Sequence, residues 1–543
     1  SDVAPTIISK ISPEDRKVRF PNALSQFVYT RTYSRWMESE GRREAWPETV
    51  ARYFGFILSE RQVPPDIAQA CYNAVLNMGV MPSMRALWSA GPAVRRDNTC
   101  MYNCSFIGID SLKSFSEVLF ILMQGTGVGF SVERKFTERL PAVAEITGET
   151  VAYKIPDSTE GWADAFFFGL QQWFKGNKVA FDYSDIRPLG AILKTKGGRA
   201  SGPEPLIRLL EFGEKTILGA AGRKLRPLEC HDLVCQVAEI VIVGGHRRSS
   251  LISFSDVDDM EMRHAKDFNQ GEFPVIRYQA NNSAFYEERP KESLFRHEWD
   301  ALANSGSGER GFSIDNWHRY SKDRPKGQVR SNPCHEIGLK FRLADNPMTG
   351  EGGAGQFCNL TAAVMRAHDT PETMIEKVRL ATWLGVIQAT FTYFPYLREG
   401  WQKHCDEDRL LGVDITGQCD NPALSMDAGL MRKLNQVAVE TAKEASSYFG
   451  VNMPAAICCG KPSGNSSQFL NCSSGFHPRY DEFYYRHVRI NAGDPLFRLI
   501  RDQGVPIFKE NGQENFADDE VTTWVARFPV KSPRGSMTRH NET

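Results

Sequence analysis

The sequence lacks any long hydrophobic run. In its 543 residues, no uninterrupted apolar stretch approaches the roughly 20 residues that a helix needs to span a bilayer. The N-terminal stretch SDVAPTIISKISPEDRK carries charges where a signal peptide needs an apolar core. We therefore predict neither membrane insertion nor export, and we expect a cytoplasmic protein.

The chain also lacks an excess of charge of either sign. Its 65 Lys and Arg residues against 66 Asp and Glu residues leave a formal net charge of -1. No global field therefore favours nucleic acid or an anionic membrane as a partner. Any phosphate group must be bound by local side chains and backbone amides.

Cysteine is sparse, with 12 residues in the whole chain, which is too dilute for a scaffold held by disulfides. No pair of CxxC motifs occurs at zinc-ribbon spacing, and the adjacent Cys458 and Cys459 suit zinc poorly. We expect no metal site. The cysteines are then thiols available for chemistry.

Helical and β-rich segments alternate along the chain, which predicts an α/β architecture. Residues 1 to about 80 have the spacing of a mainly helical cap, and amphipathic helices are expected at 374–394 and 430–449. In the second helix an apolar face runs from Leu430 to Tyr448 and Gly450 ends it. Short β-rich runs are expected at Cys104–Ile109, Gly129–Glu133, Leu251–Phe254 and Arg486–Ile490.

The sharpest chemical signal places an amide, a thiol and a carboxylate at alternating positions: Asn332, Cys334 and Glu336. In an extended segment held by Pro333, these side chains would share one side. A thiyl radical there could take a sugar hydrogen while the amide and carboxylate hydrogen-bond the neighbouring hydroxyls. As an isolated match, the motif also fits a loop with an incidental cysteine.

Two further cysteines, Cys104 and Cys358, lie inside β-like stretches. Each alone is most simply a small buried hydrophobe. Together they could form a dithiol that delivers two electrons and closes to a disulfide, a role that needs the fold to bring them together.

Three segments suit phosphate or nucleotide. Lys461–Gln468 (KPSGNSSQ) gathers small and hydroxyl residues in a predicted strand-to-helix turn, where backbone amides could cradle phosphate. It lacks the spacing of a P-loop, so a simple turn remains the alternative. The glycine-rich cationic loops 194–203 and 244–250 suit a nucleotide or are solvated loops.

In chain order the motifs NC, GGxxSGP, GGxRR, NxCxE, FCNL and PSGxSS resemble the catalytic chain of ribonucleotide reductases. The resemblance covers nearly the whole chain, and residues 29–36 (YTRTYSRW) resemble the monomeric, adenosylcobalamin-dependent (class II) branch. It implies a ribonucleoside-triphosphate reductase that supplies 2′-deoxyribonucleotides for DNA synthesis. It further implies adenosylcobalamin with its cobalt as cofactor, a deoxynucleoside triphosphate as allosteric effector, and thioredoxin or glutaredoxin as reductant.

The resemblance also implies a fold and a set of site residues. The fold is a ten-stranded α/β barrel of two half-barrels with a central finger loop. A helical cap would span 1–80, and the barrel 81–543 would include effector loops at 181–203 and 244–250. The implied catalytic residues are Cys334, Asn332, Glu336, Cys104 and Cys358. The implied substrate contacts are Ser83, Pro462, Ser463, Gly464, Asn465 and Ser466, although Asn465 stands where relatives often have Thr. The implied effector contacts are Asp185, Arg187, Lys194, Gly198, Gly245, Arg247 and Arg248.

The implied mechanism passes a radical to Cys334, which takes the ribose 3′ hydrogen while Glu336 acts on the 3′ hydroxyl. The 2′ hydroxyl leaves as water with a proton from the Cys104 and Cys358 pair, which closes to a disulfide. Cys334 then returns the hydrogen. Cys458 and Cys459 have no counterpart in the resemblance, and we expect them to fill space.

Both ends of the chain depart from the resemblance. At Thr543 the sequence stops before the last barrel strands and the cysteine-bearing tail of relatives, which predicts either a second polypeptide or a truncation. Few residues precede the first motif, so no ATP-cone domain is expected. We then expect dATP to change substrate preference without switching the enzyme off.

Several alternatives stay open at this point. The chain could be the catalytic subunit of the type that uses a separate radical-generating subunit, or, with less support, of the glycyl-radical type. It could also be a nucleotide-binding homologue without activity, against which the five retained catalytic residues argue. The substrate could be a diphosphate, although the resemblance favours a triphosphate.

Overall fold

The structure is a computed structural model that describes residues 11, 13–17, 20–193, 200–243 and 250–541. Its largest sheet has six strands in the order β10-β9-β8-β5-β4-β13. The first five run parallel, and β13 pairs antiparallel with β4. The strands are β4 (Cys104–Gly108), β5 (Gly127–Ser131), β8 (Leu251–Asp256), β9 (Ala280–Tyr286), β10 (Gly311–Ile314) and β13 (Gln356–Phe357).

Both faces of the large sheet are covered at its centre, because every residue of β4 and β5 is buried. Parallel strands need this double cover, which explains their continuous apolar or small residues. The long helices α7 (Leu112–Met123) and α11 (Pro227–Val243) contact each other and lie against strands of this sheet. The remaining helices and turns of this half are α8 (Arg134–Thr137), α12 (Met260–Arg263), α13 (Glu292–Asn304), η2 (Phe268–Gln270), η3 (Val275–Gln279) and η4 (Trp317–Arg319).

A second sheet has three strands in the order β15-β14-β3, with β14 parallel to β15 and antiparallel to β3. These strands are β3 (Val80–Met81), β14 (Leu360–Val364) and β15 (Gly412–Thr416). Helices α14 (Pro371–Ala389) and α17 (Ala428–Phe449) pack together beside it. The other elements of this half are α15 (Glu399–Asp408), η5 (Gln418–Asp420), α16 (Pro422–Ser425) and α18 (Gly464–Leu470).

Both predicted helices are present, as α14 and α17, but α14 ends at Ala389 rather than at 394, and it is not amphipathic there because every residue from Leu380 to Ala389 is buried. In α17 the predicted face is buried from Leu430 to Ala445, and Gly450 ends the helix in the left-handed conformation that glycine adopts without strain. Tyr448 lies outside this buried face, since half of its side chain is exposed. The predicted β-rich runs likewise coincide with strands.

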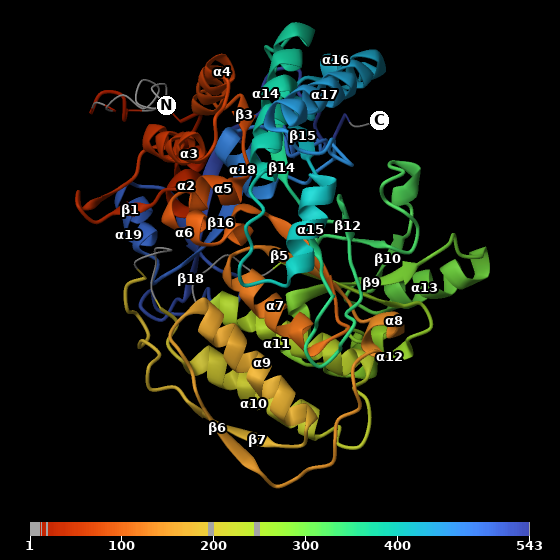
Figure 1. The fold of residues 1–543 in the computed structure, drawn as a ribbon. Helices are drawn as coiled ribbons and strands as arrows, with labels where there is room; N and C mark the ends of the chain where they lie inside the picture. Colours follow the sequence, from red (N-terminus) through yellow and green to blue (C-terminus); the bar gives the residue numbers. More distant parts are fainter. Residues whose placement is uncertain (1–10, 12, 18–19, 194–199, 244–249, 542–543) are drawn as a thin grey trace.

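Three smaller units surround the two sheets. The N-terminal unit holds α2 (Ala23–Thr32), β1 (Trp36–Met37), β2 (Arg42–Arg43), α3 (Trp46–Glu60), α4 (Pro65–Leu76), α5 (Met84–Ser89), α6 (Pro92–Arg96) and η1 (Asn98–Met101). A second unit holds β6 (Thr150–Lys154), α9 (Thr159–Phe174), β7 (Lys178–Asp182) and α10 (Glu204–Leu218), which lie together at the bottom of Figure 1. The C-terminal unit holds β16 (Phe483–Asn491), α19 (Pro495–Asp502), β17 (Ile507–Lys509) and β18 (Thr523–Lys531).

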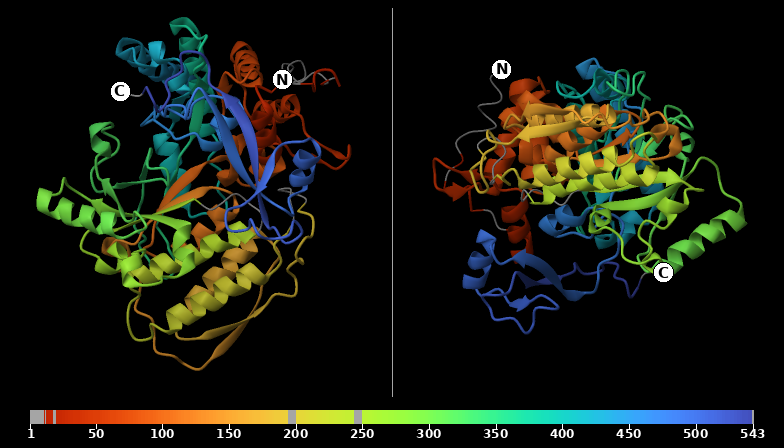
Figure 2. Two further views of the ribbon diagram at one scale, coloured as in Figure 1. Left: turned by 180° about the vertical axis from the view of Figure 1, so that it is seen from behind. Right: turned by 90° about the horizontal axis from the view of Figure 1, so that it is seen from below.

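The N-terminal helices and the C-terminal segments meet, as the two views of Figure 2 show. Helix α2 contacts α18, and the ring of Phe469 on α18 lies 4.9 Å from that of Trp46 and 5.7 Å from that of Tyr33. Residues more than 400 positions apart thus share one core. This contact supports the segment that leads into α18.

The α/β architecture predicted from the sequence is confirmed. Within the described part of the chain, the strands form separate open sheets, and no sheet closes on itself. None of the described helices is long and apolar enough to cross a lipid bilayer.

Candidate active site

A two-stranded hairpin carries the NxCxE motif. It consists of β11 (Val329–Ser331) and β12 (Gly338–Lys340), and both strands contact β4 of the large sheet. Arg330 anchors it: its guanidinium donates to both carboxylate oxygens of Glu133, at 2.8 and 3.0 Å, and lies over the ring of Phe285. Both partners of this bidentate pair are buried, so it fixes the hairpin in one position.

The motif itself forms the turn at the tip of this hairpin. The N–H of His335 donates to the carbonyl of Asn332 at 3.0 Å, and Pro333 holds the second position of that turn. The prediction of an extended segment held by Pro333 was therefore wrong. A proline fixes one backbone angle that suits turns as well as strands, and the sequence pattern does not separate the two.

The hairpin tip lies against β5 because two glycines leave room for it. A Cβ atom at Gly129 would lie 2.2 Å from the carbonyl oxygen of Ser331, and one at Gly127 would lie 3.3 Å from Pro333. A side chain at Gly129 would therefore displace the hairpin. The GVG sequence of β5 is a condition for bringing Cys334 over the sheet.

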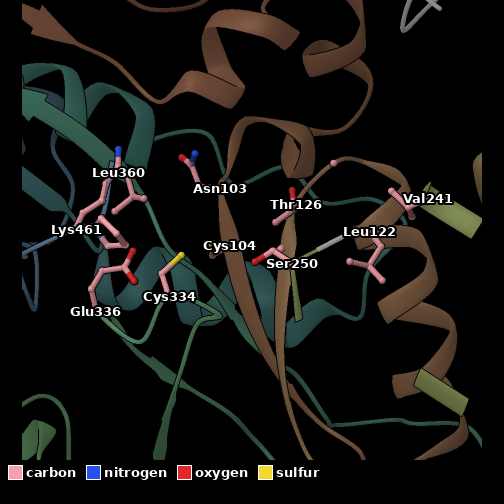
Figure 3. A pocket seen from close by; sticks show the side chains of 13 residues that line it. Asn103, Cys104, Leu122, Thr126, Val241, Ser250, Cys334, Glu336, Leu360 and Lys461 are labelled. Atoms are coloured by element: carbon pink, nitrogen blue, oxygen red, sulfur yellow. The ribbon is translucent and has the colours of Figure 1, made fainter. Parts of the chain in front are cut away.

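Cys334 lies at a cavity between the two sheets. Figure 3 shows Glu336, Lys461 and Leu360 on one side of Cys334 and Thr126, Leu122 and Val241 on the other. The lining residues are Asn103, Cys104, Leu122, Gly125, Thr126, Gly127, Val241, Ser250, Cys334, Glu336, Leu360, Lys461 and Pro462.

The two other predicted cysteines are neighbours across the sheet. Cys358 lies opposite Cys104, and its N–H donates to the Cys104 carbonyl at 2.8 Å. Their thiols are hydrogen-bonded, and the Cys104 thiol also interacts with that of Cys334. The structure therefore brings three predicted catalytic cysteines into one group, in which Cys104 and Cys358 are buried and Cys334 is exposed.

The thiols of the buried pair are held in their neutral form. The interaction with Cys334 lowers the pKa of Cys104, but the hydrogen bond with Cys358 and burial raise it more, so the pKa lies well above its usual value. Burial also raises the pKa of Cys358. Both groups therefore carry a proton at neutral pH.

Glu336 and Asn332 present polar atoms without partners. Burial raises the pKa of the Glu336 carboxyl, and the nearby Asn332 amide and Lys461 ammonium offset part of that shift. The Asn332 side-chain oxygen accepts from the N–H of Ile337 at 3.1 Å. Its amide nitrogen and Oε2 of Glu336 are buried, and neither has a hydrogen-bond partner among the described residues. Unpaired buried polar atoms are costly, so they mark a place for a polar ligand.

The predicted phosphate segment borders the same cavity. Pro462 lines it, and the adjacent Ser463 is buried, with its hydroxyl oxygen accepting from the N–H of Gly475 at 3.0 Å. Gly464, Asn465 and Ser466 form the first turn of α18, as the predicted strand-to-helix turn requires. Ser83 is buried behind the cavity wall and donates to the side chain of Asn103, at 2.8 Å.

The predicted effector residues lie elsewhere or outside the described residues. Asp185 and Arg187 follow β7, where their side chains pair with Lys154 at 3.4 Å and Asp157 at 2.6 Å. Neither lines the cavity. The other predicted effector residues, Lys194, Gly198, Gly245, Arg247 and Arg248, lie outside the described residues.

Two residues near Glu336 received no individual role from the sequence: Lys461, named only as part of the phosphate segment, and Asp414. Lys461 lines the cavity, and Asp414 on β15 accepts its N–H at 3.2 Å. Asp414 is a lone acidic residue in the apolar run LLGVDIT, which is the signal that could have revealed it. Cys459 packs against the cluster that contains Cys104, as expected of a space-filling residue, whereas Cys458 is exposed, so that expectation was wrong for it.

Two family models match the chain. The ribonucleotide reductase alpha domain matches residues 5–92, and the insertion domain of B12-dependent ribonucleotide reductase matches residues 133–216. The second match covers the unit of β6, α9 and β7, which the sequence analysis did not separate from the barrel.

Characterised relatives agree with these matches. The adenosylcobalamin-dependent ribonucleoside-triphosphate reductases of Levilactobacillus brevis and Lactobacillus leichmannii are each 25% identical to the chain, over 94% of it and 79% of their own length. The enzyme of the same name from Euglena gracilis is 25% identical over 88% of the chain and 68% of its own length.

A solved structure shares the fold. The crystal structure of a B12-dependent (class II) ribonucleotide reductase superposes with a TM-score of 0.77 at 22% identity, covering 98% of this chain and 85% of that one. At this identity the likeness establishes the fold alone. The resemblance predicted from the motifs is confirmed by these comparisons taken together.

Proposed function

Because this chain belongs to the ribonucleotide reductase family, we propose that it reduces ribonucleoside triphosphates to 2′-deoxyribonucleotides in an adenosylcobalamin-dependent reaction. One observation carries the proposal: Cys334, Cys104 and Glu336 line a single cavity, and Cys358 is hydrogen-bonded to Cys104 behind it. A radical site, a two-electron reductant and a carboxylate are the groups that this reaction needs.

The roles follow from the environment of each side chain. Cys334, as a thiyl radical, takes the 3′ hydrogen of the ribose and returns it at the end. The Glu336 carboxylate accepts a hydrogen bond and then the proton from the 3′ hydroxyl, and the pKa raised by burial makes it a stronger base than an exposed carboxylate. The unpaired amide of Asn332 donates to a ribose oxygen.

The buried pair supplies the reducing equivalents. Cys104 or Cys358 protonates the departing 2′ hydroxyl, which leaves as water, and the pair loses two electrons and two protons as the S–S bond forms. Their raised pKa values support this role, because a proton donor must be a thiol rather than a thiolate. A thioredoxin- or glutaredoxin-type dithiol then restores both thiols.

The surroundings of Cys334 fit a radical source that approaches from the cavity. Its thiol is exposed, whereas the reducing pair is buried, so a bulky group can reach Cys334 alone. The cavity wall beside it includes Gly125 and Gly127. Adenosylcobalamin, when bound, supplies the radical that Cys334 carries.

The substrate phosphates have a place at the other side of the cavity. Lys461 and Pro462 line it, and the backbone N–H groups of Gly464, Asn465 and Ser466 begin α18 beside them. A cation and free amides suit a triphosphate. We place Ser83 behind this substrate site, where its bond to Asn103 shapes the wall.

The remaining sequence predictions extend this proposal. The sheets that contain β5 and β15 would be the two halves of a barrel around the hairpin, with residues 1–80 as a cap. The segments 181–203 and 244–250 would bind a deoxynucleoside triphosphate effector. Val241 and Ser250 line the cavity on either side of the second segment, which supports communication with the substrate site.

The direct test is anaerobic, single-turnover reduction of CTP with dithiothreitol, with and without adenosylcobalamin. We expect dCTP only with the cofactor. Cofactor-independent activity, or neither dCTP nor cobalamin binding, would contradict the proposal and favour the type that uses a separate radical-generating subunit.

A further inference from the structure

A buried carboxyl group lies next to the proposed substrate site without lining it. Asp414 is on β15, its exposed fraction is 1%, and one carboxylate oxygen accepts the backbone N–H of Lys461 at 3.2 Å. The other oxygen is buried and has no hydrogen-bond partner within the described parts of the chain. Burying a carboxyl group without a full set of hydrogen bonds costs free energy of folding, so its presence in this strand calls for an explanation.

Lys461 connects this carboxyl to Glu336. Its side chain enters the cavity beside Glu336, as Figure 3 shows, and its charge lowers the pKa of both carboxyls. Its main chain leads directly into Pro462 and the proposed phosphate segment. The charge of Lys461 therefore acts on both carboxyls, and its backbone adjoins the place proposed for the substrate's phosphates.

The position of Lys461 is tightly determined. The N–H of Leu411 and that of Val413 on β15 donate to the segment 456–457, and the N–H of Cys459 donates back to Val413. A Cβ atom at Gly475 would lie 2.7 Å from the Lys461 carbonyl oxygen, so a neighbouring chain closes over it. Asp414 completes this frame, since its side chain holds the N–H of Lys461 itself.

The charged and titratable groups around Asp414 come from two segments. Lys461, Cys458 and Cys459 face it from one chain segment, and Glu336 faces it from the hairpin tip. Burial raises the pKa of Asp414 to about 6, although Lys461 lowers it in part, and the charge of Glu336 contributes to the rise. By reciprocity, an ionised Asp414 disfavours the ionised form of Glu336.

We propose that Asp414 is a positioning residue that fixes Lys461 beside the substrate phosphates and divides the ammonium charge of Lys461 between Glu336 and the nucleotide. This rests on the proposed function, since it assumes a ribonucleoside triphosphate in the cavity. Asp414 touches no reacting atom; it acts through its hydrogen bond to Lys461 and through its charge.

The proposal has two separable parts, the acceptor oxygen and the charge. Asp414→Asn keeps an acceptor for the Lys461 N–H and removes the charge. Asp414→Leu removes both. Asp110→Asn is the matched control, because Asp110 is also buried, also accepts a backbone N–H (from Ala344), and does not line the cavity.

The experiment measures the dissociation constant of CTP by calorimetry between pH 5 and pH 8, without the cofactor. Protonation of free CTP is the same in every experiment, so differences in the pH dependence between variants come from the protein. Asp414→Asn should bind CTP about threefold more tightly than wild type at pH 7.5 and equally well at pH 5, because only the ionised Asp414 opposes the anion. Asp414→Leu should bind about tenfold more weakly at all pH values, because the Lys461 N–H loses its acceptor.

Lys461→Gln tests the proposal from the other side and avoids a core substitution. We expect Lys461→Gln to bind CTP about tenfold more weakly. In the cofactor-dependent reaction, the fall in activity on acidification should begin at a higher pH than in the wild type, because the Glu336 pKa rises. Asp414→Asn should shift the loss of activity on the acid side to lower pH, because the Glu336 pKa falls. A merely structural role would move melting temperatures without these opposite shifts.

The outcomes are distinct. If wild type binds CTP but Asp414→Asn follows the wild-type pH dependence, or if Asp110→Asn reproduces its effect, the inference is overturned and the proposed function stands. If wild type binds no ribonucleotide, both are overturned. Thermal melts at each pH exclude unfolding as the cause of weak binding.

Discussion

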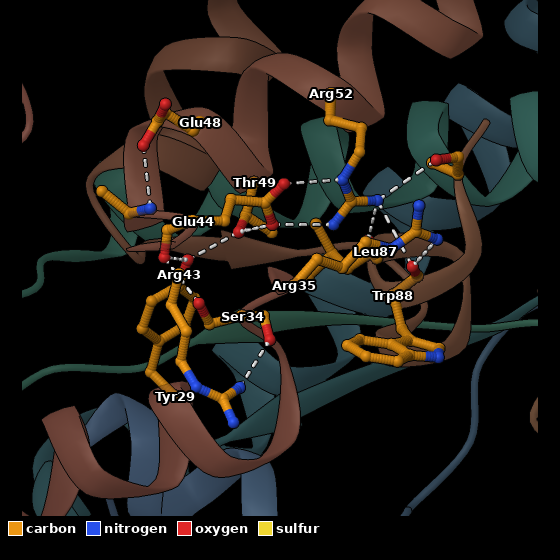
Figure 4. A network of polar contacts seen from close by, with 12 residues as sticks. Tyr29, Ser34, Arg35, Arg43, Glu44, Glu48, Thr49, Arg52, Leu87 and Trp88 are labelled. Carbon is orange, nitrogen blue, oxygen red and sulfur yellow. Dashed lines mark hydrogen bonds and ion pairs between the residues drawn. The ribbon is translucent and has the colours of Figure 1, made fainter. Parts of the chain in front are cut away.

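The side chains of two glutamates in this chain have opposite surroundings. Glu44, in the N-terminal unit, is bonded on both carboxylate oxygens: Thr49 and Arg52 donate to one, at 2.5 and 2.9 Å, and Arg52 donates to the other at 2.9 Å. Figure 4 shows this closed network, in which Tyr29 and Ser34 also donate to the Glu44 carbonyl. Glu336, at the hairpin tip, is half-buried, and its buried oxygen Oε2 is unpaired among the described residues.

The difference distinguishes a carboxylate with a structural role, Glu44, from one with a functional role, Glu336. A carboxylate whose partners all come from the protein holds segments together and has no capacity for a ligand. The cavity instead has unpaired buried polar atoms on Glu336, which lines it, and on the neighbouring Asn332. We interpret this group as a site whose hydrogen bonds are completed by a substrate.

The largest expected effect is at Cys334. Cys334→Ala should lower turnover on the order of 10³-fold or more, since no other group can take the 3′ hydrogen, and should leave the melting temperature unchanged because the side chain is exposed. Cys71→Ala is the control, as Cys71 is a buried thiol on α4. If Cys71→Ala abolished turnover and Cys334→Ala did not, the assignment of the motif would be wrong.

The two glutamates should respond in opposite ways to the same substitution. Glu44→Gln should destabilise the protein by about 3–5 kcal/mol, because Arg52 loses its buried counter-charge, while activity per folded molecule persists. Glu336→Gln should lower turnover by about 10²–10⁴-fold with little change in stability. Calorimetric melts and initial rates on both variants test the contrast, and similar profiles for the two would remove it.

A substitution in β5 tests how the site is assembled. Gly129→Ala should cost about 2–3 kcal/mol and most of the activity, since its Cβ would collide with Ser331 and displace the hairpin. Gly385→Ala is the control, because a Cβ there meets only ordinary contacts inside α14. That control should be neutral or stabilising by about 0.5–1 kcal/mol. Equal effects of the two changes would show that the hairpin does not depend on Gly129.

The smallest effect concerns the unpaired acid Asp414. Its pKa is about 6 in the folded protein against 3.8 for the exposed group, so the folded state binds more protons between these values. Its contribution to stability is therefore lost as pH rises from about 4 to 6. Asp414→Asn should stabilise the protein by up to about 3 kcal/mol at pH 7 and by little at pH 4. Melting temperatures measured across this range would contradict the account if the gain were independent of pH.

Local patterns in the sequence predicted much of the fold. The apolar periodicity of α17 and its terminal Gly450 were sufficient to place that helix, and short β-rich runs marked β4 and β8. The turn at Pro333 was missed because one proline suits both an extended strand and a tight turn. The insertion unit around β6 was missed because its helices and strands have the same local pattern as the rest of the chain.

For the site, the motifs identified the residues that react but not those that hold them in place. Cys104 and Cys358 were proposed as a possible dithiol from their β-like stretches and then supported by the resemblance, and the structure gives the reason for their pairing in the antiparallel contact between β4 and β13. Asp414 and the Arg330–Glu133 pair depend on contacts between distant segments. No local pattern encodes such contacts.

The most direct test of the account is to map the thiols after one anaerobic turnover with CTP and the cofactor, without added reductant, using differential alkylation and mass spectrometry. We predict one disulfide, between Cys104 and Cys358, for each dCTP formed, and Cys334 and Cys459 recovered as thiols. Formation of dCTP without that disulfide, or with a disulfide at Cys459, would contradict the central claim that this cavity and its buried pair carry out the reduction.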